Sequence, residues 1–503
     1  MKNKILYLLL MVLSVFTSCR KDLGNYEYTE LDSLVISGVE ESYTGYLEIN
    51  LEINPELNFA NGRDFKDKEY SYEWFTIVGA DKKVLAQTQK LNKKLNELEP
   101  GKHELYFRVT ELSTKRFWEI SSELTITTRI ADGWLVLNNI SDTARLDMLH
   151  FNSTTKNYEY NKNILAEWSK IALKGKPKLV YFVYNYDPFT SKPTARIYVG
   201  SDQETYSIDN TNRVWTSYRN LKEEVFRPTK VGYHAQVIRG MGSSNRVYML
   251  DSDGVVGYEF IINGYTYGPT INRLNTGVQL KVSKYIAEKY TNTNPYLLMY
   301  DTDNKRFITH EGTNRASLVP SSSLPDVLNP ANVGDDLLYM ESVRLSSIQF
   351  YALFQNPTTK KLRLLRATNP SSGVLRPLAF DDVESTFGIE SADFYAVDPN
   401  YGYLIFAKGN KVFQYDPFNK VFKTLLDVGN RSISLIKFQR ILQVFNNVRY
   451  NEFGSKLMVC TYDQANPNSS GKMEFYKINL SDTPVLNEVY EGFGKIVDVS
   501  YRQ

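Results

Sequence analysis

Phe413-Gln-Tyr-Asp-Pro-Phe-Asn-Lys-Val-Phe422 repeats an earlier stretch of the chain, Leu298-Met-Tyr-Asp-Thr-Asp-Asn-Lys-Arg-Phe307. The shared core is Tyr-Asp-x-x-Asn-Lys-x-Phe, and weaker copies begin at Leu149 and Phe354. In this pattern a strand ends on an aromatic residue, an Asp or Asn side chain caps a tight turn, and the next strand starts on an aromatic residue. The repeat predicts a recurring hairpin, which we interpret as the outer hairpin of a propeller blade.

The spacing of the copies predicts the number of blades. The copies are separated by near multiples of about 50 residues, a length typical of one propeller blade. Residues 131–503 would then form about seven blades, with six or eight as alternatives. Asp132-Gly133-Trp134-Leu-Val-Leu137 is expected to pair with one of the last strands and close the ring. A sandwich array, or hairpins on another scaffold, is the alternative architecture for this region.

The preceding residues, 31–130, contain short runs that alternate between polar and apolar residues. Glu48-Ile-Asn-Leu-Glu-Ile53 and His103-Glu-Leu-Tyr-Phe-Arg-Val109 are the clearest of them. Strands at this spacing predict a β-sandwich. Tyr70-Ser-Tyr-Glu-Trp74-Phe resembles the third strand of immunoglobulin-like and PKD-like domains, in which the Trp fills the core. The whole chain is therefore expected to be all-β, with an Ig/PKD-like sandwich followed by a propeller.

The N-terminus has the pattern of an export signal. A basic start at Lys2 is followed by an apolar run over residues 5–16 and then by Cys19. This pattern describes a secretory signal, and the run is too short for a membrane-spanning helix. A cysteine at this point resembles the lipobox of bacterial lipoproteins. The resemblance implies a signal peptide over residues 1–18, acylation of Cys19 and a lipidated tether over residues 19–30; a soluble secreted product is the alternative.

The composition narrows the possible partners. Among 503 residues, 59 Lys and Arg nearly balance 57 Asp and Glu, and the net charge of +2 gives no basis for a nucleic-acid partner. The abundance of Tyr and Phe, with 36 and 26 residues, suits strands. Once Cys19 is acylated, Cys460 is the other cysteine of the chain, so no internal disulfide is expected. The strand-like surroundings of Cys460 predict a buried apolar side chain.

No motif in the sequence specifies a reaction. The four histidines lie far apart, so no metal site is predicted, and no catalytic residue or cofactor is assigned. Asp251-Ser-Asp-Gly254 and Asp301-Thr-Asp-Asn304 have the composition of calcium loops but lack the later Glu of an EF-hand. Both stretches lie where a hairpin needs a turn. We therefore expect them to be turns.

Two stretches with loop-like composition carry aromatic residues suited to a binding face. Aromatic side chains in loops present flat apolar surfaces to sugars or peptides. The alternative is that these rings pack between blades. The candidate ligand-binding residues are Tyr184, Tyr186, Phe189, Tyr265 and Tyr267.

The chain as a whole resembles the PKD-like family lipoproteins of Bacteroidota-type outer membranes. The residues that carry the resemblance are Cys19 with Lys21-Asp22, Gly24-Asn-Tyr26, the strand from Tyr72 to Phe75, and Gly133-Trp134-Leu-Val-Leu. The resemblance implies a cell-surface outer-membrane lipoprotein that accompanies a nutrient-uptake system. Its expected partners are the membrane, through the lipid, a glycan or peptide ligand, and subunits of a transporter complex. A propeller-type glycan lyase or hydrolase is the alternative, which the sequence favours less than a binding protein.

Overall fold

The computed structural model describes the chain from residue 33 to residue 502, with gaps. The gaps are residues 153–154, 187–192, 212–213, 241–245, 261–265, 275–276, 290–295, 312–315, 320, 372–373, 440–451 and 481–482. The described residues form an all-β fold, as predicted, and they divide into two compact units. The first unit comprises the described residues up to Gly45 together with Ile49–Ile126, and the second comprises Tyr46–Glu48 and the residues from Thr127 onward.

The first unit is a β-sandwich built on one five-stranded sheet. Its core contains Trp74, which is 0% exposed and stacks on Phe107 with ring centroids 4.4 Å apart, as the sequence predicted. Two short pairs of strands accompany the large sheet. In sheet order the strands are β2 (Ser42–Tyr46), β9 (Phe117–Thr127), β8 (Gly101–Glu111), β5 (Tyr70–Val78) and β6 (Asp81–Ala86), with the pairs β1 (Leu34–Ser37) and β4 (Glu56–Phe59), and β3 (Leu51–Ile53) and β7 (Leu91–Lys93).

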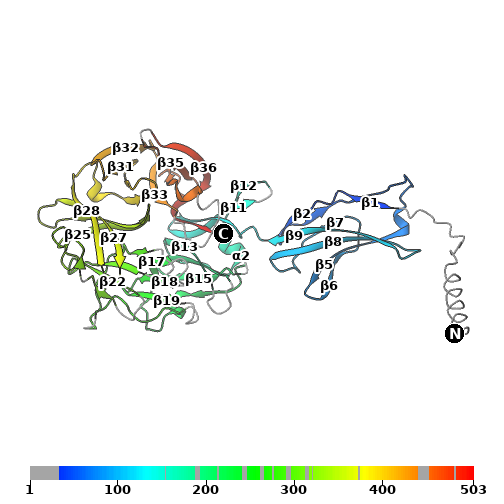
Figure 1. The fold of residues 1–503 in the computed structure, drawn as a ribbon, viewed down its shortest axis with the longest axis horizontal. Helices are drawn as coiled ribbons and strands as arrows, with labels where there is room; N and C mark the ends of the chain where they lie inside the picture. Colours follow the sequence, from blue (N-terminus) through cyan, green and yellow to red (C-terminus); the bar gives the residue numbers. More distant parts are fainter. Residues whose placement is uncertain are drawn as a thin grey trace, which may run out of the picture. The chain divides into compact units, whose positions relative to one another are not determined.

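The second unit is a β-propeller. Its described residues form seven sheets, the number that the repeat spacing predicted. Figure 1 shows the sheets arranged around a ring, with β13, β17 and β33 toward the centre and β19, β32 and β36 at the rim. The innermost strands of neighbouring sheets contact one another around the ring, for example β37 with β13 and β29 with β33.

The first three sheets have the following strands, from the innermost outward. The first consists of β37 (Lys495–Arg502), β10 (Gly133–Ile140), β11 (Thr143–Asn152) and β12 (Asn157–Asn161). The second consists of β13 (Pro177–Tyr186), β14 (Pro193–Ser201), β15 (Thr205–Asp209) and β16 (Tyr218–Asn220). The third consists of β17 (Ala235–Gly240), β18 (Arg246–Asp251) and β19 (Val256–Phe260).

The other four sheets follow in the same order. The fourth consists of β20 (Ala287–Lys289), β21 (Tyr296–Asp301), β22 (Arg306–His310) and β23 (Ser317–Leu318). The fifth consists of β25 (Asp336–Arg344), β26 (Ile348–Gln355), β27 (Leu362–Ser371), β28 (Val374–Val383) and β24 (Ser321–Ser322). The sixth consists of β29 (Phe394–Val397), β30 (Leu404–Lys408), β31 (Lys411–Asp416) and β32 (Val421–Asp427), and the seventh of β33 (Ser432–Phe438), β34 (Leu457–Tyr462), β35 (Gly471–Lys477) and β36 (Val485–Phe493).

The ring closes through the first and last strands of the propeller. β10 pairs antiparallel with β37, so that Trp134 lies opposite Tyr501, and the predicted closure is confirmed. Trp134 is 0% exposed and contacts the rings of Phe453, Phe475 and Tyr501. Such a closure ties the two ends of the propeller together and leaves only short sheet edges.

The repeated turn has the predicted local geometry in all four copies. In each copy an Asp or Asn oxygen accepts a backbone N–H inside the turn, and a Lys four residues later has a positive φ. The pairs are Asn152 and Lys156, Asp301 and Lys305, Asn356 and Lys360, and Asp416 and Lys420.

The repeat does not always form the outer hairpin of a blade, contrary to the prediction. Two copies join the third and fourth strands from the centre, as an outer hairpin should, whereas β21–β22 and β26–β27 join the second and third strands. The capped turn is a local motif that fits any antiparallel hairpin. It therefore marks hairpins and not a fixed place in the blade.

Candidate functional site

A cavity of about 270 Å³ lies at the centre of the propeller. Five of the seven inner strands contribute to its lining, namely β13, β17, β25, β33 and β37. In a strand the side chains alternate between two faces of the sheet. Among the described residues, the innermost strand of each sheet has no partner strand on its central side, so one edge of its backbone faces the ring centre. The cavity is thus lined by side chains from distant parts of the sequence and by the edges of strands.

Side chains of β37 bond to the free edge of β13. The backbone N–H of Val180 donates to Asp498 Oδ2 at 3.0 Å, and the N–H of Phe182 donates to Ser500 Oγ at 3.0 Å. An unpaired N–H at a sheet edge is unfavourable when it is buried. Asp498 and Ser500 therefore hold two neighbouring inner strands together.

The same arrangement recurs around the ring. Gly240 N–H of β17 donates to the Tyr181 hydroxyl of β13 at 3.0 Å, and Val397 N–H of β29 donates to Glu341 Oε2 of β25 at 3.3 Å. In each case the acceptor belongs to one sheet and the donor to the next sheet along the chain. Several polar residues of the cavity therefore have a structural role. These hydrogen bonds between inner strands could not be predicted from the sequence, because the bonded residues are up to 318 positions apart.

The cationic side chains of the cavity come from three different strands: Lys178 of β13, Arg239 of β17 and Lys437 of β33. Lys437 Nζ lies 2.9 Å from Asp498 Oδ1, and Arg239 Nε lies 3.8 Å from the carboxylate of Glu288, which is 0% exposed. Lys178 is exposed and forms no ion pair within the part of the chain that the structure describes.

The two carboxylates that line the cavity are already hydrogen-bonded. Asp498 accepts from Val180 N–H, from Val499 N–H and from Lys437, and Glu341 accepts from Val397 N–H and the Tyr339 hydroxyl. Acid–base catalysis of glycosidic cleavage would need a pair of carboxylates open to the substrate. The described lining instead offers the unpaired Lys178 together with hydroxyl and amide groups, which suits binding of an anionic ligand.

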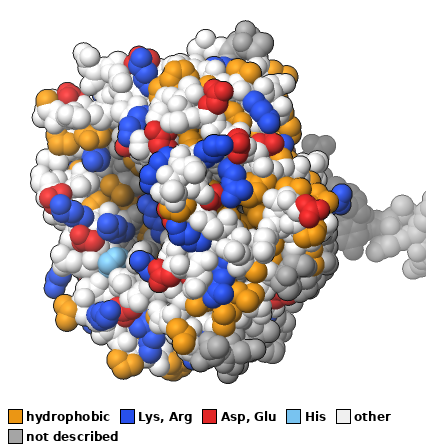
Figure 2. All heavy atoms as spheres, turned by 90° about the vertical axis from the view of Figure 1, so that its left-hand side faces the viewer, with side chains coloured by type: hydrophobic (Ala, Val, Ile, Leu, Met, Phe, Trp, Pro, Cys, Tyr) orange, Lys and Arg blue, Asp and Glu red, His pale blue; other side chains and the backbone are white. Residues whose placement is uncertain are grey.

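Two basic residues elsewhere on the propeller are paired with carboxylates. Figure 2 shows Lys and Arg side chains gathered near the middle of the side that carries β25 and β28 in Figure 1, with acidic side chains among them. In the fifth blade, Arg363 Nη2 lies 2.5 Å from Asp335 Oδ2. Lys420 Nζ lies 3.3 Å from Asp381 Oδ1. Such pairing lowers the local attraction for an anion, in contrast to Lys178 in the cavity.

Of the predicted binding aromatics, the two whose side chains the structure describes, Tyr184 and Tyr267, do not line the central cavity. Tyr184 is half-buried and packs against the core between the first two blades, and Tyr267 is 1% exposed within the core between the second and third blades. Both positions fit the alternative, in which the rings pack between blades. Phe189, Tyr265, the side chain of Tyr186 and the proposed lipidation site Cys19 lie outside the described residues.

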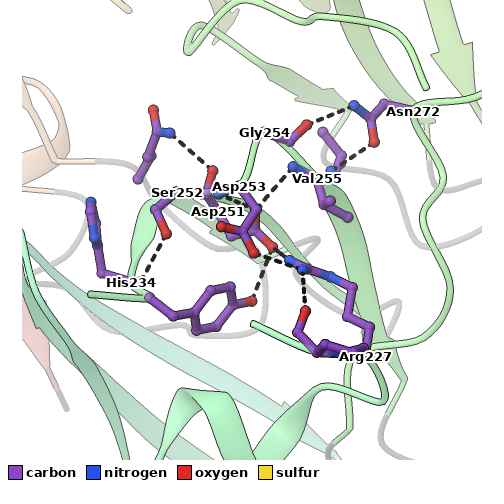
Figure 3. A network of polar contacts seen from close by, with 12 residues as sticks. Arg227, His234, Asp251, Ser252, Asp253, Gly254, Val255 and Asn272 are labelled. Atoms are coloured by element: carbon purple, nitrogen blue, oxygen red, sulfur yellow. Dashed lines mark hydrogen bonds and ion pairs between the residues drawn. The ribbon is translucent and has the colours of Figure 1, made fainter. Parts of the chain in front are cut away.

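The two acidic stretches are turns, as expected. Figure 3 shows Asp251 inside its own turn, where its Oδ1 accepts the N–H groups of Asp253 and Val255 at 2.9 Å each. Arg227 pairs with both carboxylates, at 2.8 Å from Asp253 Oδ2, so each carboxylate already has a cationic partner within the protein. Among the described residues no cluster of three His, Cys, Asp or Glu side chains could hold a metal ion.

Cys460 also has the predicted role of a core residue. The side chain is 0% exposed and packs among residues of the first and seventh blades. Burial raises the pKa of its thiol well above the usual range. A thiol in this state is a poor nucleophile.

The fold defines a β-propeller protein with an immunoglobulin-like N-terminal sandwich. Residues 19–177 match the PKD-like family, which confirms the resemblance to that family seen in the sequence. No curated protein matches the chain. Within the described ranges no helix has the length and apolar character to cross a membrane.

Solved structures give distant matches over most of the chain. A quinonprotein alcohol dehydrogenase-like protein from Bacteroides thetaiotaomicron is 11% identical, with a TM-score of 0.39, and the match covers 94% of this chain and 97% of that one. Apo AztD from Citrobacter koseri is 8% identical, with a TM-score of 0.37, and the match covers 86% of this chain and 98% of that one.

Proposed function

We propose that this protein is a lipid-anchored binding protein of the bacterial cell surface, whose propeller captures an acidic glycan or peptide in its central cavity. The observation that carries the proposal is Lys178, which lines the cavity and forms no ion pair among the described residues, whereas Lys437 and Arg239 face carboxylates. Anionic groups are attracted to an unpaired cation in a concave site, because the walls exclude water and focus the field. The cavity is near the small end of the size range of ligand sites.

The proposed cellular role is that of an accessory protein in an outer-membrane nutrient-uptake system. It is supported by the match of residues 19–177 to the PKD-like family and by the signal-like sequence before Cys19. Acylation of Cys19 would anchor the protein to the membrane. We expect Cys19→Ser to move the protein from the membrane fraction to the soluble fraction. Unchanged fractionation of this variant would contradict lipid anchoring without affecting the binding proposal.

The binding proposal is tested with an array of acidic and neutral glycans and peptides. We expect retention of acidic ligands, and binding that weakens as salt rises. Lys178→Ala should weaken binding about threefold to tenfold, corresponding to roughly 1 kcal/mol for one exposed charge. Lys174→Ala is the matched control, because Lys174 is also exposed but does not line the cavity.

Two results would overturn the proposal. One is that the unmodified protein binds acidic and neutral ligands equally well and that Lys178→Ala binds them as tightly as the unmodified protein does. The other is release of cleaved products from a retained glycan, which would favour the lyase or hydrolase. Recovery of transporter subunits with the native protein in mild detergent would support the accessory role, and their absence would count against it.

A further inference from the structure

The third blade differs from the others at its outer edge. In the part of the chain that the structure describes, it has three strands, whereas each other blade has four or five. The place of a fourth strand is taken by residues 266–273, which contact β19 only at separate points. Gly268 N–H donates to the Tyr258 carbonyl at 3.0 Å, and Ile271 N–H donates to the Val256 carbonyl at 2.8 Å.

Between this segment and the blade lies a pocket of about 340 Å³. Gly257 and Gly268 line it, and neither has a side chain to fill the space. The pocket is separate from the central cavity, since no lining residue is shared. Its size matches the lower end of small-molecule sites.

Most of the pocket wall is apolar. Val255 and Pro269 contribute to it, together with Phe226, whose side chain is 85% exposed. A large aromatic side chain at this exposure is unfavourable in water and is available to stack on another ring. The wall therefore favours a flat, apolar group.

One of the two guanidinium groups that line the pocket, that of Arg273, is unmatched by any carboxylate among the described residues. Figure 3 shows Arg227 directed at Asp251 and Asp253, so this guanidinium is already engaged by two carboxylates. Arg273 also lines the pocket, and its buried Nε has no hydrogen-bond partner among the described residues. A guanidinium binds a carboxylate through paired hydrogen bonds. The unmatched group therefore favours an anion beside the apolar wall.

We propose that this pocket binds a small aromatic carboxylate, with the ring against Phe226 and the carboxylate at Arg273. The same ring and carboxylate occur in free aromatic acids and at the end of a peptide that terminates in phenylalanine. The site is independent of the function proposed for the central cavity. Its ligand is held by one aromatic contact and one charged contact, so both parts of the ligand are required.

The test is a titration of the full-length protein, in mild detergent, with 3-phenylpropionate followed by calorimetry. Matched probes are 3-phenylpropanol, which lacks the charge, and propionate, which lacks the ring. We expect 3-phenylpropionate to bind at least tenfold more tightly than either probe. Gly-Gly-Phe tests the peptide source: tighter binding than 3-phenylpropionate supports a peptide end, and weaker binding supports a free acid.

Variants separate this site from the rest of the protein. Arg273→Gln and Phe226→Ala should each weaken binding of 3-phenylpropionate about tenfold, whereas Arg376→Gln, an exposed Arg on β28, should not. Because Phe226 is largely exposed, its variant should keep the circular dichroism spectrum and the thermal midpoint of the unmodified protein. Lys178→Ala should leave binding unchanged. The proposal is overturned if 3-phenylpropionate does not bind at millimolar concentration, or if it binds equally to Arg273→Gln.

Discussion

Replacing Glu224 by glutamine should remove much of the pH dependence of the propeller's stability. Glu224 lies in the short helix η2 (Leu221–Glu224) and is 1% exposed. Arg196 donates to Glu224 Oε1 at 2.5 Å and to Glu259 Oε1 at 2.6 Å, so that two buried carboxylates share one guanidinium. Burial raises the pKa of Glu224 to about 7; Arg196 opposes this rise and Glu259 adds to it.

The sign of the effect follows from this raised pKa. The folded protein holds the proton of Glu224 more tightly than the unfolded chain, whose carboxyl titrates near its ordinary pKa of 4.5. The stabilisation is therefore complete below about pH 4.5 and is lost as the pH rises through about 7. At about 1.4 kcal/mol for each pH unit, the loss is on the order of 3 kcal/mol. For a unit of this size, that corresponds to roughly 4 °C in the thermal midpoint.

The assay is thermal unfolding between pH 5 and pH 8.5 for the unmodified protein and for Glu224→Gln. We expect the midpoint of the unmodified protein to fall by several degrees relative to the variant as the pH rises. Glu223→Gln is the matched control, because Glu223 lies in the same helix and is exposed. Parallel curves for the unmodified protein and Glu224→Gln would refute the reasoning, as would an equal effect of Glu223→Gln.

Three further predictions concern the fold. Trp134→Ala should lower the free energy of unfolding of the propeller by about 3–5 kcal/mol, measured by urea denaturation, because it leaves a cavity where β10 and β37 pair to close the ring. Asp416→Ala should lower it by about 1 kcal/mol in the same measurement, since Phe418 N–H loses its acceptor; an unchanged midpoint would show that the cap is dispensable. Cys460 should resist iodoacetamide in the folded protein and react in urea, because it is 0% exposed; labelling of the folded protein would contradict its burial.

The fold could be predicted from the sequence because its signals are local. The Asp-capped turn determines a hairpin within a few residues, and the four copies recur often enough to indicate repeated sheets. Trp134 and Trp74 lie in apolar, strand-like stretches that indicate a core position from sequence alone. The same locality explains the misplaced hairpins, because a turn motif contains no information about the distance of its strands from the ring centre.

The candidate site could not be predicted, because its residues meet only in the folded ring. Lys178 and Lys437 occur in ordinary strand sequences, and nothing near either residue indicates a shared cavity. Of the aromatic residues that the sequence offered for binding, Tyr184 packs against the core between two blades, and Tyr267 is buried but also lines the pocket beside β19. One weak signal was present: charged residues interrupt the apolar pattern of the inner strands, as Asp498 does in β37.

A crystal structure of the protein with the acidic ligand that it retains best would locate the binding site. We predict that the anionic group of the ligand lies in the central cavity, within hydrogen-bonding distance of Lys178, Arg239 or Lys437. A ligand bound on the outer rim of the blades, with the cavity unoccupied, would contradict the assignment of the propeller centre as the binding site.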